Sequence, residues 1–318
     1  PAMHLTVTAS DVTVAGVDAN LTIPEASAVF TPTGLLAQRP FELVFSDLQL
    51  DLTFDPSARN IEGSSGMAVL AGLVAGGASG GASGDTKSLT NQRLRINRAV
   101  LNLRHVDDAV APIDLVNINA VGSFDQGTLV NGMVSAERMA NAAPAGRLEA
   151  AVLGDPLGGT FSLDMAADNL LLDGVTAYAP PLAEMLPFSG NISGRMNAAI
   201  RDSAIAVFDL DAAATGGTLA LPQPFRAIDY KTASVISTYH RDGGTLTVAQ
   251  SEIVLNDGRV LSVQGDIADI DGPAPVITGR IDGNDLSLDS FYADWPDMMA
   301  PQAKAMLQER FSGGQLSD

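Results

Sequence analysis

The sequence predicts a mostly β protein: a long, curved antiparallel sheet built from repeating β modules, with short helices at the junctions. Three observations support this prediction. Short runs alternate apolar and polar residues, Gly- and Asp-rich turns separate these runs, and one strand–helix segment occurs twice. Alternation with a period of two is typical of strands with one dry and one solvated face. Because 46% of the 318 residues are hydrophobic but only 5% are aromatic, the apolar surface is mostly small and aliphatic.

The first predicted strands lie before residue 60. In "MHLTVTAS" the apolar positions include Leu5 and Val7, and in "DLQLDLTF" they include Leu48, Leu50 and Leu52. The run "RLRINRAVLNLR", from residue 93, continues the pattern. Each run therefore predicts a strand with one apolar face.

A Gly/Ala/Ser-rich segment at about 66–90 interrupts the strands. Residues 67–75 fit a short apolar helix, far below the roughly 20 residues that a membrane span needs. Residues 76–84 have the composition of a flexible loop. Residues 77–81 match the hydrolase pattern G-x-S-x-G, but that pattern needs a strand–turn–helix context, and a Gly/Ser run produces it by chance.

Further strands are predicted in the second half of the chain. The stretch "GTLTVAQSEIVLNDGRVLSVQGDI" alternates again, with turn signals at 242–244 and 256–258 that favour an antiparallel meander. Its apolar positions are Leu246, Val248, Ile253, Leu255, Leu261 and Val263.

An internal repeat divides the chain. "LLLDGVTAYAPPLAEM" at 170–185 aligns without gaps on "LSLDSFYADWPDMMAP" at 286–301, and "FSGNIS" after the first copy matches "FSGGQLS" after the second. Recurrence of strand, helix and strand predicts repeating units. We expect a first β module at 1–169, a second at 170–285, and a junction helix with the start of a third module at 286–318.

Charge and residue usage argue against several functions. The net charge is −19, without a Lys/Arg cluster, so nucleic acid is not expected as a partner. The chain has no Cys, and its three histidines, His4, His105 and His240, lack metal-ligand spacing. Asp-rich stretches at 266–272 and 281–289 favour β-turns, with calcium loops as the alternative, although they lack the usual calcium-loop spacing. We expect no metal, no cofactor and no enzymatic activity.

The last predicted element is a helical stretch that carries the single Trp, Trp295. Pro296 suits its first turn, Ala303, Met306 and Leu307 recur at helical spacing, and a Gly pair at 313–314 ends it. The chain begins with Pro and shows no signal peptide or membrane anchor, so we interpret it as an internal fragment.

The string "DWP…AP-x-AKAML…F-x-GG" resembles the junction segment of the AsmA-like family of bacterial envelope proteins, which includes the YhdP- and TamB-type bridge-like lipid transfer proteins. Trp295, Pro296 and Ala303 fit the family pattern. Lys304 replaces the usual Arg, and Met306 replaces a second Trp. The segments at 170–200 and 93–108 look like the same family's junction and its "i-x-i-x-x-a-x-l" strands.

This resemblance implies a periplasmic protein that an N-terminal helix outside this sequence anchors in the inner membrane. It also implies a β-groove whose apolar inside carries phospholipid acyl chains between the inner and outer membranes. The groove residues would include the apolar positions named above: Leu5, Val7, Leu48, Leu50, Leu52, Leu246, Val248, Ile253, Leu255, Leu261 and Val263. The same alternation also describes a dry sandwich core. The competing function is that of a structural or adhesive β-solenoid or β-sandwich surface protein.

The Gly/Ala/Ser loop yields a direct prediction. Deleting residues 76–84 leaves the melting temperature unchanged, because this composition does not support a packed core. Thermal melting of the deletion variant beside the intact chain checks this. A variant that no longer unfolds cooperatively would contradict it.

Overall fold

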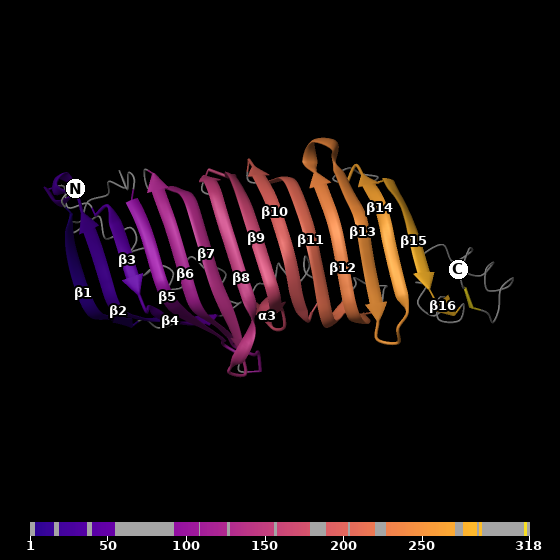
Figure 1. Ribbon diagram of the computed structural model, residues 1–318, viewed down its shortest axis with the longest axis horizontal. Coiled ribbons are helices and arrows are strands. Elements are labelled where there is room, and N and C mark those ends of the chain that lie inside the picture. The colour runs from indigo at the N-terminus through magenta and orange to yellow at the C-terminus, as the bar shows by residue number, and fades with distance from the viewer. Residues whose placement is uncertain are drawn as a thin grey trace. The chain divides into compact units, whose positions relative to one another are not determined.

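The computed structural model (Figure 1) describes thirteen stretches of the chain. They are residues 4–15, 19–36, 40–54, 92–107, 109–125, 128–155, 158–178, 189–202, 204–219, 227–270, 276–284, 286–287 and 315–316. The predicted apolar helix at 67–75, the loop at 76–84 and the junction-helix residues Trp295, Pro296, Ala303, Met306 and Leu307 lie outside the described residues. Within the described stretches, no helix is long and apolar enough to cross a membrane.

The described residues form a mostly β structure whose strands pair chiefly antiparallel, which confirms the predicted mostly β fold class. They group into two compact units. Unit 1 comprises residues 1–170, 174–180 and 197–205, and unit 2 comprises residues 171–173, 181–196 and 206–318. The two units are described separately.

In unit 1 the hydrogen-bonded strand order is β1-β2-β3-β5-β6-β7-β8-β9, with β4 pairing to β2 and β5. A short helix, α1 (Pro32–Leu36), follows β2, and another, α3 (Val175–Tyr178), follows β9. The strands lie side by side in Figure 1. Their bounds are β1 Leu5–Ala15, β2 Ala19–Phe30, β3 Glu42–Ser46, β4 Gln49–Phe54, β5 Gln92–His105, β6 Ile113–Asp125, β7 Thr128–Ala140, β8 Ala143–Asp155 and β9 Thr160–Leu171.

In unit 2 the order is β10-β11-β12-β13-β14-β15, and β10 and β11 also contribute residues to unit 1. A 3-10 turn, η2 (Arg241–Gly243), joins β12 to β13, and a separate antiparallel pair is formed by β16 and β17. The bounds are β10 Asn191–Arg201, β11 Ala204–Leu219, β12 Ile228–His240, β13 Thr245–Leu255, β14 Val260–Ala268, β15 Val276–Asn284, β16 Leu286–Ser287 and β17 Gln315–Leu316.

Strand β5 departs from the all-antiparallel expectation. It runs parallel to both β3 and β4, while its other neighbour, β6, is antiparallel. Parallel neighbours need a long connection, and the 55–91 segment between β4 and β5 supplies the length. The Gly/Ala/Ser-rich interruption therefore coincides with the one change of strand direction among the described pairings of unit 1.

A row of left-handed residues crosses adjacent strands of unit 1. Asp47 lies between β3 and β4, Arg98 within β5 and Asn117 within β6, with φ of 56°, 55° and 51°. The Arg98 guanidinium donates to both carboxylate oxygens of Asp47, each at 2.8 Å, and the Arg98 backbone N–H donates to the Asn119 side chain at 3.1 Å. Each such residue inserts an extra position into its strand, which bends the strand as a β-bulge does.

The inserted residue shifts the alternation of side chains by one position. In β5 the apolar residues are Leu94 and Ile96 before Arg98, and Ala99 and Leu101 after it, so the even positions give way to odd ones. Residues from both sides of the bend pack together. The buried cluster consists of Leu21, Ile23, Phe45, Leu48, Leu50 and Ala99, with Leu43, Leu94, Ile96 and Leu101 packed against it.

The Asp47–Arg98 pair is electrostatically favourable but exposed to solvent. Hydrogen bonds from Arg98 lower the pKa of the Asp47 carboxyl below its usual value. The stabilisation is therefore present above the carboxyl's ordinary pKa, and it is lost as pH falls through the lowered pKa. Because solvent screens an exposed ion pair, the Asp47–Arg98 pair adds little to the free energy of unfolding. Its main effect is to orient the bend.

The bend in β6 is testable at Asn117, which has a positive φ and donates from its side chain to Glu137 at 2.8 Å. Asn117→Val places a β-branched residue in the left-handed region and lowers the free energy of unfolding by about 1–2 kcal/mol more than Asn117→Gly. Both variants lose the side-chain hydrogen bond, so glycine is the matched control. Urea unfolding measures the difference, and equal losses would contradict the strain argument.

Candidate apolar binding face

The sheet of unit 2 has one apolar and one polar face. Residues paired across neighbouring antiparallel strands project to the same face. On one face, four rows cross β11 to β14: Phe208, Tyr239, Leu246 and Ile267; Leu210, Ser237, Val248 and Gly265; Ala212, Val235, Ser251 and Val263; Ala214, Ala233, Ile253 and Leu261. On the other face, the rows include Asp209, Thr238, Thr247 and Asp266, and Ala213, Ser234, Glu252 and Ser262.

The structure brings most of the predicted groove residues of unit 2 together on the apolar face. Leu246, Val248, Ile253, Leu261 and Val263 lie in adjacent rows. All five are half-buried, whereas the interior of a packed sandwich would bury them almost completely. Leu255 also lies on this face, opposite Tyr230, but is only 7% exposed.

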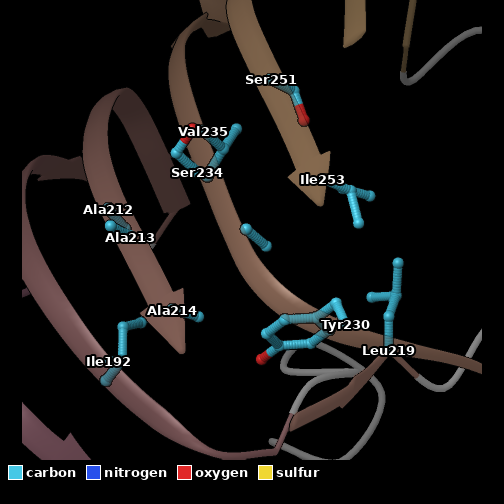
Figure 2. Close-up of a pocket in the computed structure, with 11 residues that line it drawn as sticks. Ile192, Ala212, Ala213, Ala214, Leu219, Tyr230, Ser234, Val235, Ser251 and Ile253 are labelled. Atoms are coloured by element: carbon cyan, nitrogen blue, oxygen red, sulfur yellow. The ribbon is translucent and has the colours of Figure 1, made fainter. Parts of the chain in front are cut away.

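A hollow of about 160 Å³ lies on this face (Figure 2). None of its lining residues is charged, and four of those on the apolar face are only Ala or Ser. By the pairing, Ala213 and Ser234 point to the opposite face, so they border the hollow through their backbones. The full lining consists of Ile192, Ala212, Ala213, Ala214, Leu219, Tyr230, Ala233, Ser234, Val235, Ser251 and Ile253.

Tyr230 forms one end of the hollow, as Figure 2 shows. Its ring reaches past β11, and its hydroxyl donates to the Ser189 backbone oxygen at 2.5 Å. A glycine lies beneath: a Cβ on Gly217 would collide with that same Ser189 oxygen and lie 2.7 Å from the Tyr230 hydroxyl. Tyr230 is only 1% exposed, so its side chain is packed on nearly all sides.

The repeated junction supplies the Ser189 anchor. The Leu172 N–H donates to the Gly190 oxygen at 2.9 Å, and the Gly190 N–H donates to the Asp173 carboxylate at 3.1 Å. Leu172, Asp173 and Gly190 correspond in the repeat to residues 288, 289 and 313, and in that second copy β16, before residue 288, pairs with β17, after residue 313. The strand ends that flank the loop therefore pair with each other in both copies.

Unit 1 places its five predicted groove residues differently. Leu5 and Val7 lie on β1, paired with Phe30 and Ala28, and are 48% and 52% exposed. Leu48 and Leu50 are buried in the cluster at the bend, and Leu52 packs against that cluster half-buried. Leu48 and Leu50 thus serve as core residues, because the bend folds both arms of the sheet around them.

A second tyrosine is tethered in unit 1. The hydroxyl of Tyr178, in α3, donates to the Leu103 and Ala111 backbone oxygens at 3.3 and 3.0 Å. Its ring meets His105 edge-on, with centroids 5.6 Å apart, and lies 5.8 Å from the Phe54 ring. His105 is thus part of an aromatic contact. Sequence patterns did not single out either tethered tyrosine, because their partners are backbone oxygens distant in sequence.

The electrostatics of both tyrosines follow from burial. Desolvation raises the pKa of the Tyr178 and Tyr230 hydroxyls, and the carboxylate of Asp173 raises that of Tyr230 further. Each hydroxyl stays protonated as a donor over the ordinary pH range. In the described stretches, no group of three or more His, Asp or Glu residues is arranged to hold a metal ion. The lining of the hollow is uncharged and chiefly apolar.

Comparison with protein-family models, curated proteins and solved structures returned no match.

The Tyr230 tether is testable by removing only its hydroxyl. Tyr230→Phe lowers the free energy of unfolding by about 0.5–1.5 kcal/mol, the usual net value of one hydrogen bond. Because the folded-state pKa is raised, wild-type stability from this group is intact below the usual tyrosine pKa of about 10 and is lost as pH rises through the raised value. Urea unfolding at neutral and alkaline pH measures both effects. A variant as stable as wild type at neutral pH would contradict the tether.

Proposed function

We propose that the apolar face of unit 2 binds lipid acyl chains, and that the chain is part of a non-enzymatic phospholipid carrier. The observation that carries the proposal is the hollow, which opens on a half-exposed aliphatic face and has no charged lining residue. Burying an alkyl chain is worth about 0.8 kcal/mol per methylene. A site for such a chain needs a continuous apolar strip, and rows of Leu, Ile, Val and Ala supply one.

The arrangement of the two faces supports an acyl chain over a soluble metabolite. Ligand sites for polar molecules add a few placed hydrogen-bonding groups to an apolar pocket. Here the polar side chains of β11 to β14 project mainly to the opposite face, so a headgroup would stay in solvent while the tail lies on the strip. The resemblance of the junction segments to AsmA-like proteins extends this proposal to carriage of phospholipid between the inner and outer membranes, from a periplasmic location.

The alternative is a structural or adhesive surface protein. Its apolar faces would be filled, and its repeats would be short and regular. The half-buried state of Leu246, Val248 and Ile253 favours the lipid-binding proposal over that alternative.

A charge on the strip separates the two functions. Val248→Asp puts a carboxylate in the middle of the apolar face, where desolvation against an acyl chain is costly, so lipid capture falls at least tenfold. Since Val248 is half-buried, we expect a loss of unfolding free energy of at most about 1–2 kcal/mol. Gln250→Asp, two residues along β13 and exposed on the other face, is the matched control and retains lipid capture.

The measurement is capture of a radiolabelled phospholipid from vesicles, with thermal melting of the same samples. Wild-type protein that captures no lipid would overturn the proposal. A Val248→Asp variant that unfolds while Gln250→Asp melts normally would instead indicate a packed core.

A further inference from the structure

Tyr230 is distinguished from the rest of the apolar face by its immobility. It is one of the least exposed side chains described, its hydroxyl is bonded to Ser189, and its ring lies against Gly217. Ser189 is fixed in turn, since its N–H donates to the Thr218 oxygen and its hydroxyl accepts from the Thr218 N–H, both at 3.0 Å. The Tyr230 ring is therefore held in place beside the hollow.

Away from Tyr230, small side chains lie at the bottom of the hollow. The next two rows contain Ala214 and Ala233, then Ala212 and Ser251. Beyond them, the row of Leu210 and Val248 also contains Ser237 and Gly265. The side chains that line the hollow lie between Ser251 and Val235 on one side and Tyr230 and Leu219 on the other (Figure 2).

We propose that Tyr230 is a specificity-determining residue: it stops the methyl end of an acyl chain that lies along the strands, and so sets the chain length that the site accepts. This inference rests on the proposed function, and it adds a length limit that an apolar strip alone would not have. Each methylene that fits into the hollow tightens binding about fourfold. Methylenes that would overlap the Tyr230 ring gain nothing, because the tethered ring does not make room for them.

Two substitutions change the length of the hollow in opposite directions. Tyr230→Leu removes the ring and lengthens the hollow, whereas Ala233→Leu fills its middle and shortens it. Tyr230→Phe keeps the ring and loses only the hydroxyl. Ser262→Leu adds the same leucine as Ala233→Leu but on the opposite face and outside the lining of the hollow, so it is the control for a general effect of added apolar surface.

The experiment measures Kd for a series of saturated alkylphosphocholines of increasing chain length, each below its critical micelle concentration. For wild type, we expect Kd to fall about fourfold per methylene and then reach a plateau. The plateau moves to longer chains in Tyr230→Leu and to shorter chains in Ala233→Leu. It stays in place in Tyr230→Phe and Ser262→Leu, whatever their melting temperatures.

The outcomes separate the two proposals. Wild-type protein that binds no member of the series overturns lipid binding itself. Binding with the same plateau in wild type, Tyr230→Leu and Ala233→Leu overturns the length stop and leaves lipid binding standing. If Tyr230→Leu does not fold, Ala233→Leu decides alone, and an unshortened plateau in that variant overturns the stop.

Discussion

The structure of unit 1 depends on one local constraint: single residues in the left-handed conformation, aligned across neighbouring strands. In a strand that bends without an inserted residue, side chains would keep alternating strictly, so residues on the apolar face would stay all odd-numbered or all even-numbered. At Arg98 and Asn117 the inserted residue exchanges odd- and even-numbered positions between the two faces at the point where the strand bends. Ile96 and Ala99 of β5 therefore lie on one face, and so do Leu115 and Ile118 of β6. Both arms then contribute to one cluster. Asn and Asp suit such positions because their short polar side chains tolerate positive φ, and Arg98 is held there by Asp47.

The apolar face of unit 2 is anchored at its junction end, and the rest of the face is left half-buried. Tyr230 and Leu255 are buried at the junction end, and the rows from Ala214 to Phe208 extend away from them. The backbone ladders hold the strands whether or not the face is covered. Stability at the junction comes from hydrogen bonds to backbone groups of Ser189, Gly190 and Thr218. A binding face that is rigid before its ligand arrives loses little conformational entropy on binding.

Much of the fold was predictable because period-two alternation is a strong local signal: the strands containing Leu50, Leu94, Val248 and Leu261 all form where the pattern predicts them. The bends were not predicted, although their signal is present. In "RLRINRAVLNLR" the two polar residues Asn97 and Arg98 separate two correctly alternating halves, and such a doubled spacer marks a bulge. The placement of Leu48 and Leu50 in a core followed from those bends. The tyrosine tethers were beyond sequence reasoning, because a backbone oxygen such as that of Ser189 leaves no residue-specific trace.

The distribution of charge completes the physical account of an exposed apolar face. An exposed apolar strip is an aggregation hazard unless something opposes self-association. The net charge of −19 does so over distance, and Asp209, Glu252 and Asp266 place part of it on the face opposite the strip. Charge on that face leaves the strip itself free of carboxylates, whose desolvation would oppose an alkyl chain. The two faces therefore differ in composition: one carries charge that opposes self-association, and the other stays apolar, as the proposed binding of a lipid tail requires. Because alternate residues of the same strands supply both, a one-residue slip in register would exchange them, and the bulges near Tyr230 and Val248 must keep their positions for the face to persist.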